Sequence, residues 1–290
     1  MQSFKAVDHL ADASRSDATA GGHIAVNSKG WPTTGALERL QSGGMFLRNH
    51  VEHIDTNAVQ WQQTGAGVYT KTINANQDSG ARTVLVKLVP EEGFDPPSKI
   101  HYHTLSEELL ILDGLLTFDH KTWLDGISYI YHPPSMIHGF KSATPETTTL
   151  LARGTGELDF NFPDPSEVDI DSPVDGSTPT RDLLYLNNIN DKVWSPIYGD
   201  DGQQVGEMFS LGTDSQTGEG ACFERYFLGW TRAAISDGFA VYDEVYVLDG
   251  EISSGSNDVW AKGHYWYRAP ETPQPTLQSQ SGALVFRCFG

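Results

Sequence analysis

Short runs of apolar, β-branched and aromatic residues recur along most of the chain, and glycine, proline, aspartate or asparagine separates them. Runs of this length and spacing are typical of strands in an all-β sandwich or barrel. Only residues 36–41 (ALERLQ) have a helical pattern, which predicts one short helix. The clearest predicted strands are Thr83–Leu88, Glu108–Asp113, Ser128–His132, Thr148–Ala152, Val241–Leu248 and Ala283–Phe289.

Two stretches of this pattern resemble each other. In each, a tryptophan precedes a strand, a longer strand follows, and an acidic pair opens an apolar strand that ends in Leu-Asp-Gly. Aligning Gly114 with Gly250 places Glu107 opposite Asp243. Self-similarity of this kind predicts an internal duplication.

The segment between the two stretches, residues 161–184, is rich in Pro, Asp and Ser and poor in apolar residues, which is typical of a linker. We therefore predict an N-terminal extension (1–49), a first barrel domain (50–160), this linker, and a second barrel domain (185–290). A length of 290 residues with 38% hydrophobic residues is enough for two such cores.

The chain is strongly acidic, with a formal net charge of -19. Such a surface repels phosphate backbones and anionic lipid, so we expect neither nucleic acid nor membrane as a partner. No apolar run reaches the length of a membrane span, and the first residues lack the apolar stretch of a signal peptide. We therefore predict a cytoplasmic protein.

The two cysteines, Cys222 and Cys288, both lie in apolar runs. Two thiols are too few for a disulfide framework or a thiolate zinc site. We predict buried free thiols in a reducing compartment.

The residues with the clearest chemistry lie between positions 93 and 139. His101 and His103 are one residue apart, so on a strand both imidazoles point to the same face. Glu107 opens the next apolar strand, and His138 follows about thirty residues later. Glu108 is a competing carboxylate, but strand alternation places it on the face opposite Glu107.

This segment resembles the two sequence motifs of the cupin superfamily. The stretch GFDPPSKIHYHTLSEELLILDG matches the first motif, with two extra residues after its first glycine. The stretch GISYIYHPPSMIH matches the second motif, with one extra residue before Pro133 and with Ser135 in place of the usual glycine. The resemblance implies two cupin barrels (double-stranded β-helices, or jelly rolls). It also implies one metal ion, with the ligands His101, His103, Glu107 and His138.

Three imidazoles and one carboxylate suit a divalent transition metal better than Ca²⁺ or Mg²⁺. We expect Fe²⁺ first, with Mn²⁺, Ni²⁺, Zn²⁺ or Cu²⁺ as alternatives. Four protein ligands on a six-coordinate ion leave two positions for water, dioxygen or a substrate.

The second half of the chain departs from the motifs. In the alignment, Asp237 and Phe239 replace the two strand histidines, and Gln274 replaces His138. This half resembles cupins of the ChrR anti-sigma-factor type in its fold only, and we predict that it binds no metal.

The resemblance implies a metal-dependent enzyme with a small-molecule substrate. We expect a non-haem dioxygenase that cleaves an oxygen-rich compound of the β-diketone or aromatic ketone class, with Glu107 as the catalytic base. The alternatives are a metal-dependent isomerase, cyclase or lyase, and a non-catalytic zinc-binding sensor module of the ChrR type. We also expect a homo-oligomer, most simply a dimer.

Other candidate residues have weaker support. His132 is expected to have a structural role near the mouth of the site, and His120 is expected to face solvent on a hairpin. Residues expected near the metal are Leu109, Ile111, Met136 and Phe140, with Lys87 and Lys99 as partners for an anion. The histidines with no partner spacing are His9, His23, His50, His53 and His264.

Overall fold

The computed structural model describes residues 48–290, except 97–98, 140–141, 157, 165–168, 200 and 256–257. The helix predicted at residues 36–41 and nearly all of the predicted extension lie outside the described residues. Within the described residues, the one helical element is a 3-10 turn, η1 (Ile189–Asp191), and the other elements are strands. The predicted all-β class is confirmed.

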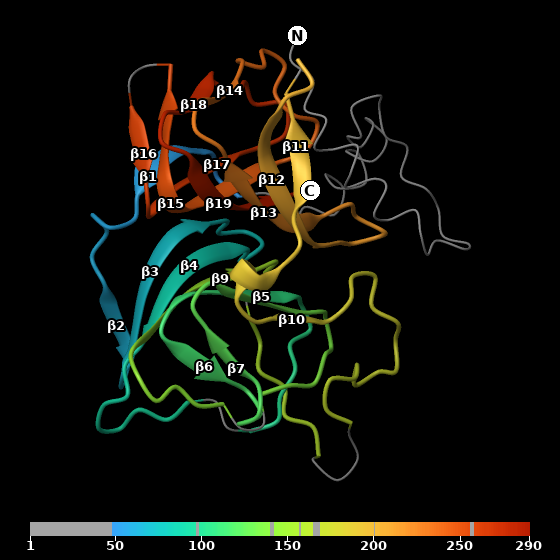
Figure 1. The fold of residues 1–290 in the computed structure, drawn as a ribbon. Coiled ribbons are helices and arrows are strands. Elements are labelled where there is room, and N and C mark those ends of the chain that lie inside the picture. Colours follow the sequence, from blue (N-terminus) through green and yellow to red (C-terminus); the bar gives the residue numbers. More distant parts are fainter. Residues whose placement is uncertain are drawn as a thin grey trace. The chain divides into compact units, whose positions relative to one another are not determined.

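The chain forms two compact units. The middle unit is Val59–Lys192, and the terminal unit combines Val193–Gly290 with the described residues before Val59. In Figure 1 the strands of the middle unit run from blue through green to yellow, and those of Val193–Gly290 run from yellow to red.

The middle unit contains a seven-stranded antiparallel sheet in the order β10-β8-β5-β9-β4-β3-β2, and β6 pairs with β7 in a separate hairpin. Its strands are β2 (Gln62–Gly65), β3 (Val68–Ala75), β4 (Arg82–Leu88), β5 (Glu107–Asp113), β6 (Leu115–Thr117), β7 (Trp123–Asp125), β8 (Ser128–His132), β9 (Thr148–Gly154) and β10 (Leu184–Leu186).

The terminal unit contains a ten-stranded sheet whose main path is β1-β17-β15-β19-β13-β12-β11, with β14, β16 and β18 attached to it. Its strands are β1 (Val51–Asp55), β11 (Ser195–Tyr198), β12 (Gln204–Thr213), β13 (Gly220–Tyr226), β14 (Trp230–Arg232), β15 (Asp243–Ser254), β16 (Val259–Ala261), β17 (His264–Arg268), β18 (Leu277–Ser279) and β19 (Ala283–Phe289). All six strands that the sequence predicts most clearly are present.

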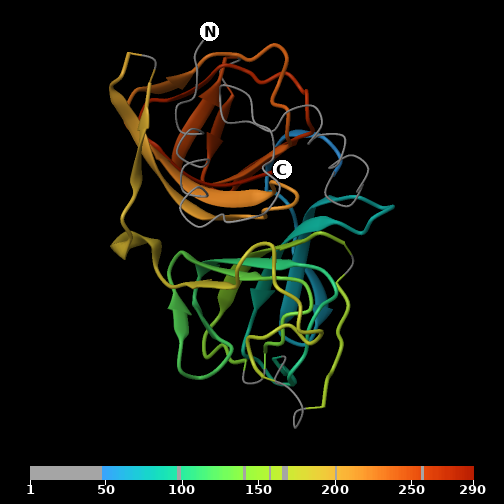
Figure 2. The ribbon, with the colours of Figure 1, turned by 90° about the vertical axis from the view of Figure 1, so that its right-hand side faces the viewer.

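The two main sheet paths follow one plan. Each strand of the path β10-β8-β5-β9-β4-β3-β2 has a counterpart, in the same position, in β1-β17-β15-β19-β13-β12-β11. The register agrees as well, because Glu107 faces His132 across β5 and β8, and Asp243 faces Arg268 across β15 and β17. The predicted duplication requires this agreement. Figure 2 shows the strands of each unit curving around an interior, as the cupin barrel does.

The first strand of this plan is exchanged between the repeats. β1 precedes the strands of the middle unit in the chain, yet it pairs with β17 of the terminal unit. β10 precedes the strands of the terminal unit, yet it pairs with β8 of the middle unit. The units therefore do not follow the predicted limits 50–160 and 185–290, because order along the chain does not determine which free sheet edge a short strand joins.

The exchanged segments carry the same buried contacts in both units. Arg181, three residues before β10, donates a hydrogen bond to Glu108, which also accepts one from Tyr129 Oη at 2.8 Å. Arg48, three residues before β1, lies 3.4 Å from Glu244, which accepts a hydrogen bond from Tyr265 Oη at 2.9 Å. Each carboxylate is thus held on the face of its strand away from the barrel interior.

The segment predicted as a linker packs on the middle unit. Asn161 bridges to Tyr102 through backbone hydrogen bonds in both directions. Further along, the amide of Ile137 donates to the carbonyl of Ser172, and the amide of Asp171 donates to the carbonyl of Ile137. The described parts of this segment are therefore held to the unit by backbone hydrogen bonds, in spite of their polar composition.

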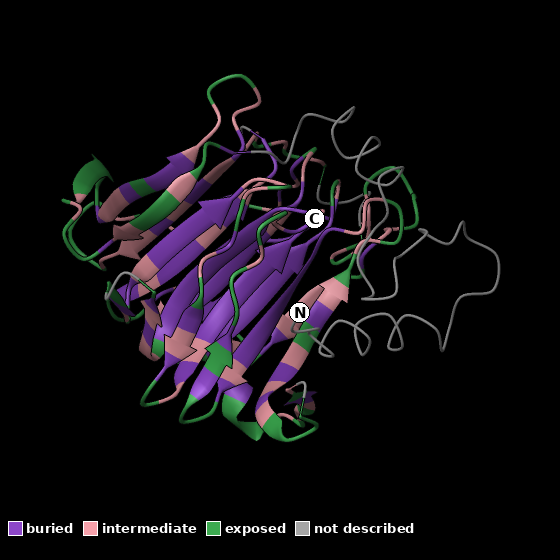
Figure 3. Cartoon of the chain, turned by 90° about the horizontal axis from the view of Figure 1, so that it is seen from above, coloured by how far each residue is buried: buried purple, intermediate pink, exposed green. Residues whose placement is uncertain are grey.

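Apolar side chains from alternate strand positions fill each interior. In the middle unit they include Leu109, Ile111 and Ile130, and in the terminal unit they include Val245, Trp266 and Val285. In Figure 3 the buried residues run along the strands and the exposed ones lie mainly in the connections. Burial of this apolar surface, at about 25 cal/mol per Å², is the main force that stabilises such barrels.

Cys222 and Cys288 are buried free thiols, as predicted. Among the residues that the structure describes, no helix is long and apolar enough to cross a membrane.

Candidate metal centre

Three histidines meet at one end of the middle barrel because two extended segments pair there. The amide of His101 donates to the carbonyl of His138 at 3.0 Å, and the amide of His138 donates back to His101 at 2.9 Å. The amide of Ser135 donates to the carbonyl of His103 at 2.7 Å. The two sequence motifs are therefore joined through their backbones at the histidines themselves.

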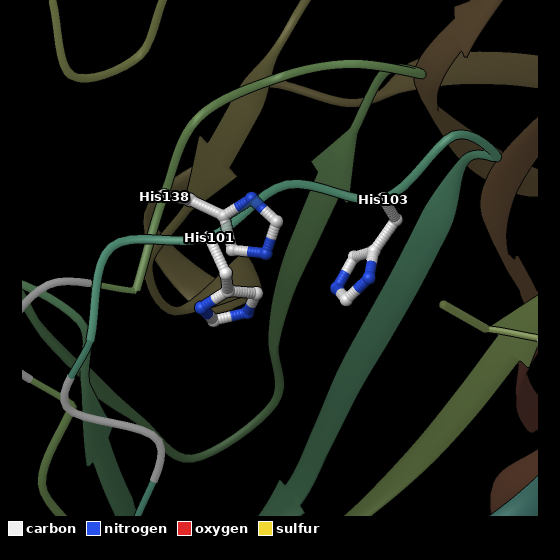
Figure 4. Close-up of side chains that lie close together, drawn as sticks. All are labelled: His101, His103 and His138. Atoms are coloured by element: carbon white, nitrogen blue, oxygen red, sulfur yellow. The ribbon is translucent and has the colours of Figure 1, made fainter. Parts of the chain in front are cut away.

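The three rings form a compact buried group, shown in Figure 4. The ring centroids lie 5.1 Å apart for His101 and His103, 4.5 Å for His101 and His138, and 5.1 Å for His103 and His138. Gly139 makes room for this group, since a Cβ at that position would lie 2.3 Å from Cε1 of His101. Gly139 also has a φ of 78°, a conformation that glycine adopts at little cost.

Each ring is oriented by a backbone carbonyl. Nδ1 of His101 donates to Lys99 at 2.8 Å, Nδ1 of His138 donates to Met136 at 2.8 Å, and Nδ1 of His103 donates to Asp159. A proton on Nδ1 leaves the lone pair on Nε2, and this is the usual arrangement of imidazoles that bind metals.

The Nε2 atoms of His103 and His138 are buried and have no hydrogen-bond partner within the described residues. Buried polar atoms normally have one, since an unsatisfied group costs about 1–3 kcal/mol. Ligand atoms of all three histidines lie within 4.8 Å of one another. The donor set therefore fits a transition-metal ion, which would satisfy the orphaned nitrogens.

Glu107 faces the same point. Its Oε2 lies 3.6 Å from Nε2 of His138 and 3.9 Å from Nε2 of His103. Burial alone would raise the pKa of Glu107, but the hydrogen bond from His132 and the surrounding histidines lower it to about 2. The side chain is therefore a carboxylate over the whole physiological range.

Two of the histidines are held in the neutral form. Burial, together with the nearby His132, lowers the pKa of His138 to about 3. Burial also lowers the pKa of His101, against the opposing effect of its hydrogen bond to Lys99. A neutral imidazole is the form that binds a metal.

Glu108 is turned away from the histidines. Arg153, Arg181 and Tyr129 all donate hydrogen bonds to its carboxylate. Burial would raise the pKa of Glu108, but the two guanidinium groups lower it to about 2. The structure thus brings Glu107, and not Glu108, to the three histidines.

A series of hydrogen-bonded side chains extends from Glu107, and the sequence did not predict it. His132 Nδ1 donates to Glu107 Oε2 at 2.9 Å, and its Nε2 lies 3.0 Å from Tyr185 Oη. Tyr185 Oη lies 3.3 Å from Asp171 Oδ1. The ring of His132 also stacks on His138, with centroids 3.8 Å apart. His132 therefore orients two members of the site.

A pocket opens beside the site. Its lining is formed by Phe118, Asp119, Thr122, Leu124, His138, Gly139, Ile170, Asp171 and Tyr185. Next to His101 lie the exposed rings of Phe160 and Phe162, with centroids 5.2 Å and 6.3 Å from that of His101. Apolar surface thus borders the histidines outside the pocket as well.

None of the described residues that were expected near the metal lines the pocket beside His138. Leu109 and Ile111 belong to the hydrophobic core, and Met136 is buried and absent from the pocket lining. Lys87 lies over the rings of Trp61 and Tyr69. Phe140 lies outside the described residues. His120 is exposed, as predicted.

The corresponding end of the terminal barrel has different chemistry. Gln274 pairs with Ile235 as His138 pairs with His101, so the strand histidines correspond to Ile235 and Asp237. The predicted pair, Asp237 and Phe239, is shifted by two residues, because the loops before β5 and β15 differ in length. Asp243 accepts a hydrogen bond from Arg287 Nε at 2.7 Å.

An ion pair between Asp243 and Arg287 thus lies in the terminal unit at the position that Glu107 has in the middle unit. Among the described residues, two groups of side chains have metal-binding geometry, and both lie in the middle unit: His101, His103 and His138, and Glu107, His132 and His138.

Comparison with known proteins gives a family match and a set of similar folds. Residues 49–159 match the model of the ChrR cupin-like domain. No curated protein matches the chain.

Among solved structures, one from Nostoc punctiforme that is named provisionally as a dioxygenase has a TM-score of 0.67 and 19% identity, covering 92% of this chain and 94% of that one. Lactobacillus farciminis oxalate decarboxylase, in complex with formate, has a TM-score of 0.51 and 12% identity, covering 84% of this chain and 86% of that one. At these identities the likeness concerns the fold.

Proposed function

Since the chain belongs to the cupin superfamily and carries two barrels of that fold, we propose that its middle unit is the catalytic part of a metal-dependent enzyme. The observation that carries the proposal is the orientation of the three histidines. Each Nδ1 is bound to a backbone carbonyl, and the buried Nε2 atoms of His103 and His138 have no hydrogen-bond partner.

The residues that would hold the ion are His101, His103, His138 and Glu107. A bound transition metal supplies Lewis acidity and, when it is redox-active, the ability to bring dioxygen into reaction with an organic substrate. The donor set favours Fe²⁺, Mn²⁺, Ni²⁺, Zn²⁺ or Cu²⁺ over harder ions.

Side chains of the middle unit bind the substrate and accept its proton. The pocket beside His138 binds the substrate, with Phe118, Leu124 and Ile170 against its apolar part. Glu107, a carboxylate held by His132, accepts a proton from an acidic C–H or O–H group of the substrate. Burial of the three histidines limits the access of water to their ligand atoms and strengthens these interactions.

The reaction that we propose is oxidative C–C cleavage of a β-diketone or aromatic ketone, with both atoms of dioxygen entering the products. Such substrates have oxygen atoms that chelate a metal and a weakly acidic C–H or O–H group for Glu107. The similar fold of a protein provisionally named as a dioxygenase supports this choice.

Metal content is the first test. Protein purified without a histidine tag is expected to contain close to one equivalent of a transition metal. His101→Ala and His138→Ala should each lose most of it, because each removes a ligand. His120→Ala, an exposed position, is the matched control and should keep the metal. Full metal content in both ligand variants would refute the assignment of the site.

Oxygen consumption is the second test. The Fe²⁺-loaded protein is expected to consume one O₂ per substrate cleaved, with β-diketones or hydroxylated aromatic ketones as substrates. Glu107→Gln should retain part of the metal and lose most of the turnover. Stoichiometric metal without oxygen uptake on any of these compounds would reject the dioxygenase and keep the metal site.

The family match favours one second candidate. A ChrR-like cupin domain over residues 49–159 is compatible with a zinc-binding sensor module without catalysis. In that case the purified protein would contain Zn²⁺, and loading it with Fe²⁺ would produce no oxygen consumption.

A further inference from the structure

The charge of the pocket beside His138 restricts which compounds it can bind. Two of its lining residues are carboxylic acids, Asp119 and Asp171, and neither lysine nor arginine is among the described residues that line it. Lys121 is close in the chain but exposed and outside the lining. A substrate that carries a carboxylate would meet repulsion here.

The two carboxylates are not equivalent. Asp119 is engaged in its own turn, where it accepts hydrogen bonds from the amides of Lys121 and Thr122 at 2.8 and 2.7 Å. Asp171 lies at the exposed side of the pocket, and its side chain has one hydrogen bond within the described residues, from Tyr185 Oη at 3.3 Å. Asp171 therefore retains acceptor capacity for a ligand.

Asp171 lies at the edge of the pocket, where its carboxylate is partly exposed. Its backbone amide is fixed to the carbonyl of Ile137, next to His138. Partial burial raises the pKa of Asp171, with Tyr185 acting in the opposite direction. A cation beside this carboxylate would offset the loss of hydration.

We propose that the pocket selects substrates that carry an ammonium group, with metal-chelating oxygens at one end and the ammonium at Asp171, and that it disfavours carboxylates. The inference rests on the proposed function, because the chelating end requires the metal. It narrows the substrate class to an amino-bearing β-diketone or aromatic ketone, and it separates this site from one that accepts a small dicarboxylate.

Three catechols test the proposal, and they differ in the group that ends a two-carbon link to the ring, which is an ammonium, a hydrogen atom or a carboxylate. Dopamine is cationic, 4-ethylcatechol is neutral, and 3-(3,4-dihydroxyphenyl)propionate is anionic, and all three chelate metals through the same two oxygens. Binding to the Zn²⁺-loaded protein is measured by calorimetry at low ionic strength, without oxygen. We expect dopamine to bind roughly tenfold more tightly than the anion, with 4-ethylcatechol between them, because exposed charge pairs contribute up to about 1 kcal/mol.

Asp171→Asn is the decisive variant, because asparagine keeps the size of the side chain and its acceptor for Tyr185. It should reduce the preference for dopamine to about threefold or less and leave the affinity for 4-ethylcatechol unchanged. Asp113→Asn, an exposed position on β5 outside the pocket, is the matched control and should keep the full preference.

The outcomes separate the two proposals. A protein that takes up no Zn²⁺ contradicts the proposed function itself. If Zn²⁺ binds and the anion binds as tightly as dopamine, the proposed function stands and the substrate inference fails. If the preference is the same in Asp171→Asn and Asp113→Asn, it comes from the overall net charge of -19, and the inference also fails.

Discussion

Two neighbouring glutamates on β5 serve opposite faces of one strand. Glu107 points to the histidines, and Glu108 points to Arg153 and Arg181. Strand alternation in the sequence is enough to predict this division, since side chains at i and i+1 must diverge. The partners of Glu108 could not be predicted, because Arg181 is 73 residues away in the chain.

Glu108→Gln should leave the metal bound and destabilise the fold. The substitution removes a charge that two buried guanidinium groups require, and breaking such a buried pair costs about 3–5 kcal/mol. We expect full metal content per folded protein and a clearly lower midpoint of urea unfolding. Loss of metal from a variant of unchanged stability would place the ligand at Glu108.

The metal-free protein should lose stability as the pH falls below about 6.5. Unfolded imidazoles take up a proton near that pH, whereas the folded pKa of His138 is about 3 and that of His101 is also lowered. The unfolded state then binds more protons, so the free energy of unfolding falls by up to about 1.4 kcal/mol per pH unit for each group.

Urea unfolding between pH 7.5 and 5.0 checks this prediction, in a window above the usual pKa of carboxylates. His138→Gln, which cannot titrate, should show a shallower decline. Stability of the metal-free protein that stays constant or rises toward pH 5.0 would show that these histidines are not held neutral.

His132, Tyr185 and Asp171 illustrate what residue patterns cannot convey. The role of His132 depends on the register that places it across from Glu107, which the sequence alone does not determine. Tyr185 lies on a strand that joins the middle unit only through exchange, and Asp171 belongs to a segment with the composition of a linker. Neither Tyr185 nor Asp171 could therefore be assigned to the pocket from the sequence.

At the scale of elements, strand positions follow from the sequence and strand partners do not. Apolar alternation bounded by turn residues identifies β4, β5, β8, β9 and β19 within one or two residues. β1 and β10 are only five and three residues long, and a pattern that short does not specify which sheet edge they pair with. The exchange was therefore invisible in the sequence.

Because of the strand exchange, substitutions of the equivalent residues Arg48 and Arg181 should affect different units. Arg48→Met should weaken the terminal unit, where Arg48 meets Glu244, and leave metal binding unchanged. Arg181→Met should weaken the middle unit, where Arg181 meets Glu108 beside the metal site. The two effects are distinguished by measuring hydrogen exchange of β17 and β8 together with the metal content. Metal loss in Arg48→Met with β17 still protected would contradict this assignment of partners.

At the scale of the whole molecule, one duplicated plan carries two kinds of chemistry. The middle barrel gathers neutral imidazoles around a carboxylate, and the terminal barrel holds Asp243 in an ion pair with Arg287. The sequence predicts this asymmetry, since ligand residues are visible in one half and absent in the other. The expected homodimer stays a prediction.

Metal should therefore protect one half of the molecule. We expect added Zn²⁺ to slow hydrogen exchange in β5, β8 and residues 133–139, because a ligand that binds the folded state stabilises the region it contacts. β15 and β17 are the internal control and should exchange at an unchanged rate. Equal protection of both sets of strands would indicate a second site in the terminal unit.

The exchange of first strands also sets an order in time. Arg48, just before β1, is held by Tyr267, which follows it by 219 residues. At a synthesis rate of about 5–20 residues per second, roughly 10–40 s pass on the ribosome before the partner of β1 exists. During that interval β10 can pair with β8 and complete the sheet of the middle unit, while β1 has no partner strand. The unit that carries the metal site can therefore fold first, and β1, the first strand among the described residues, is among the last to pair.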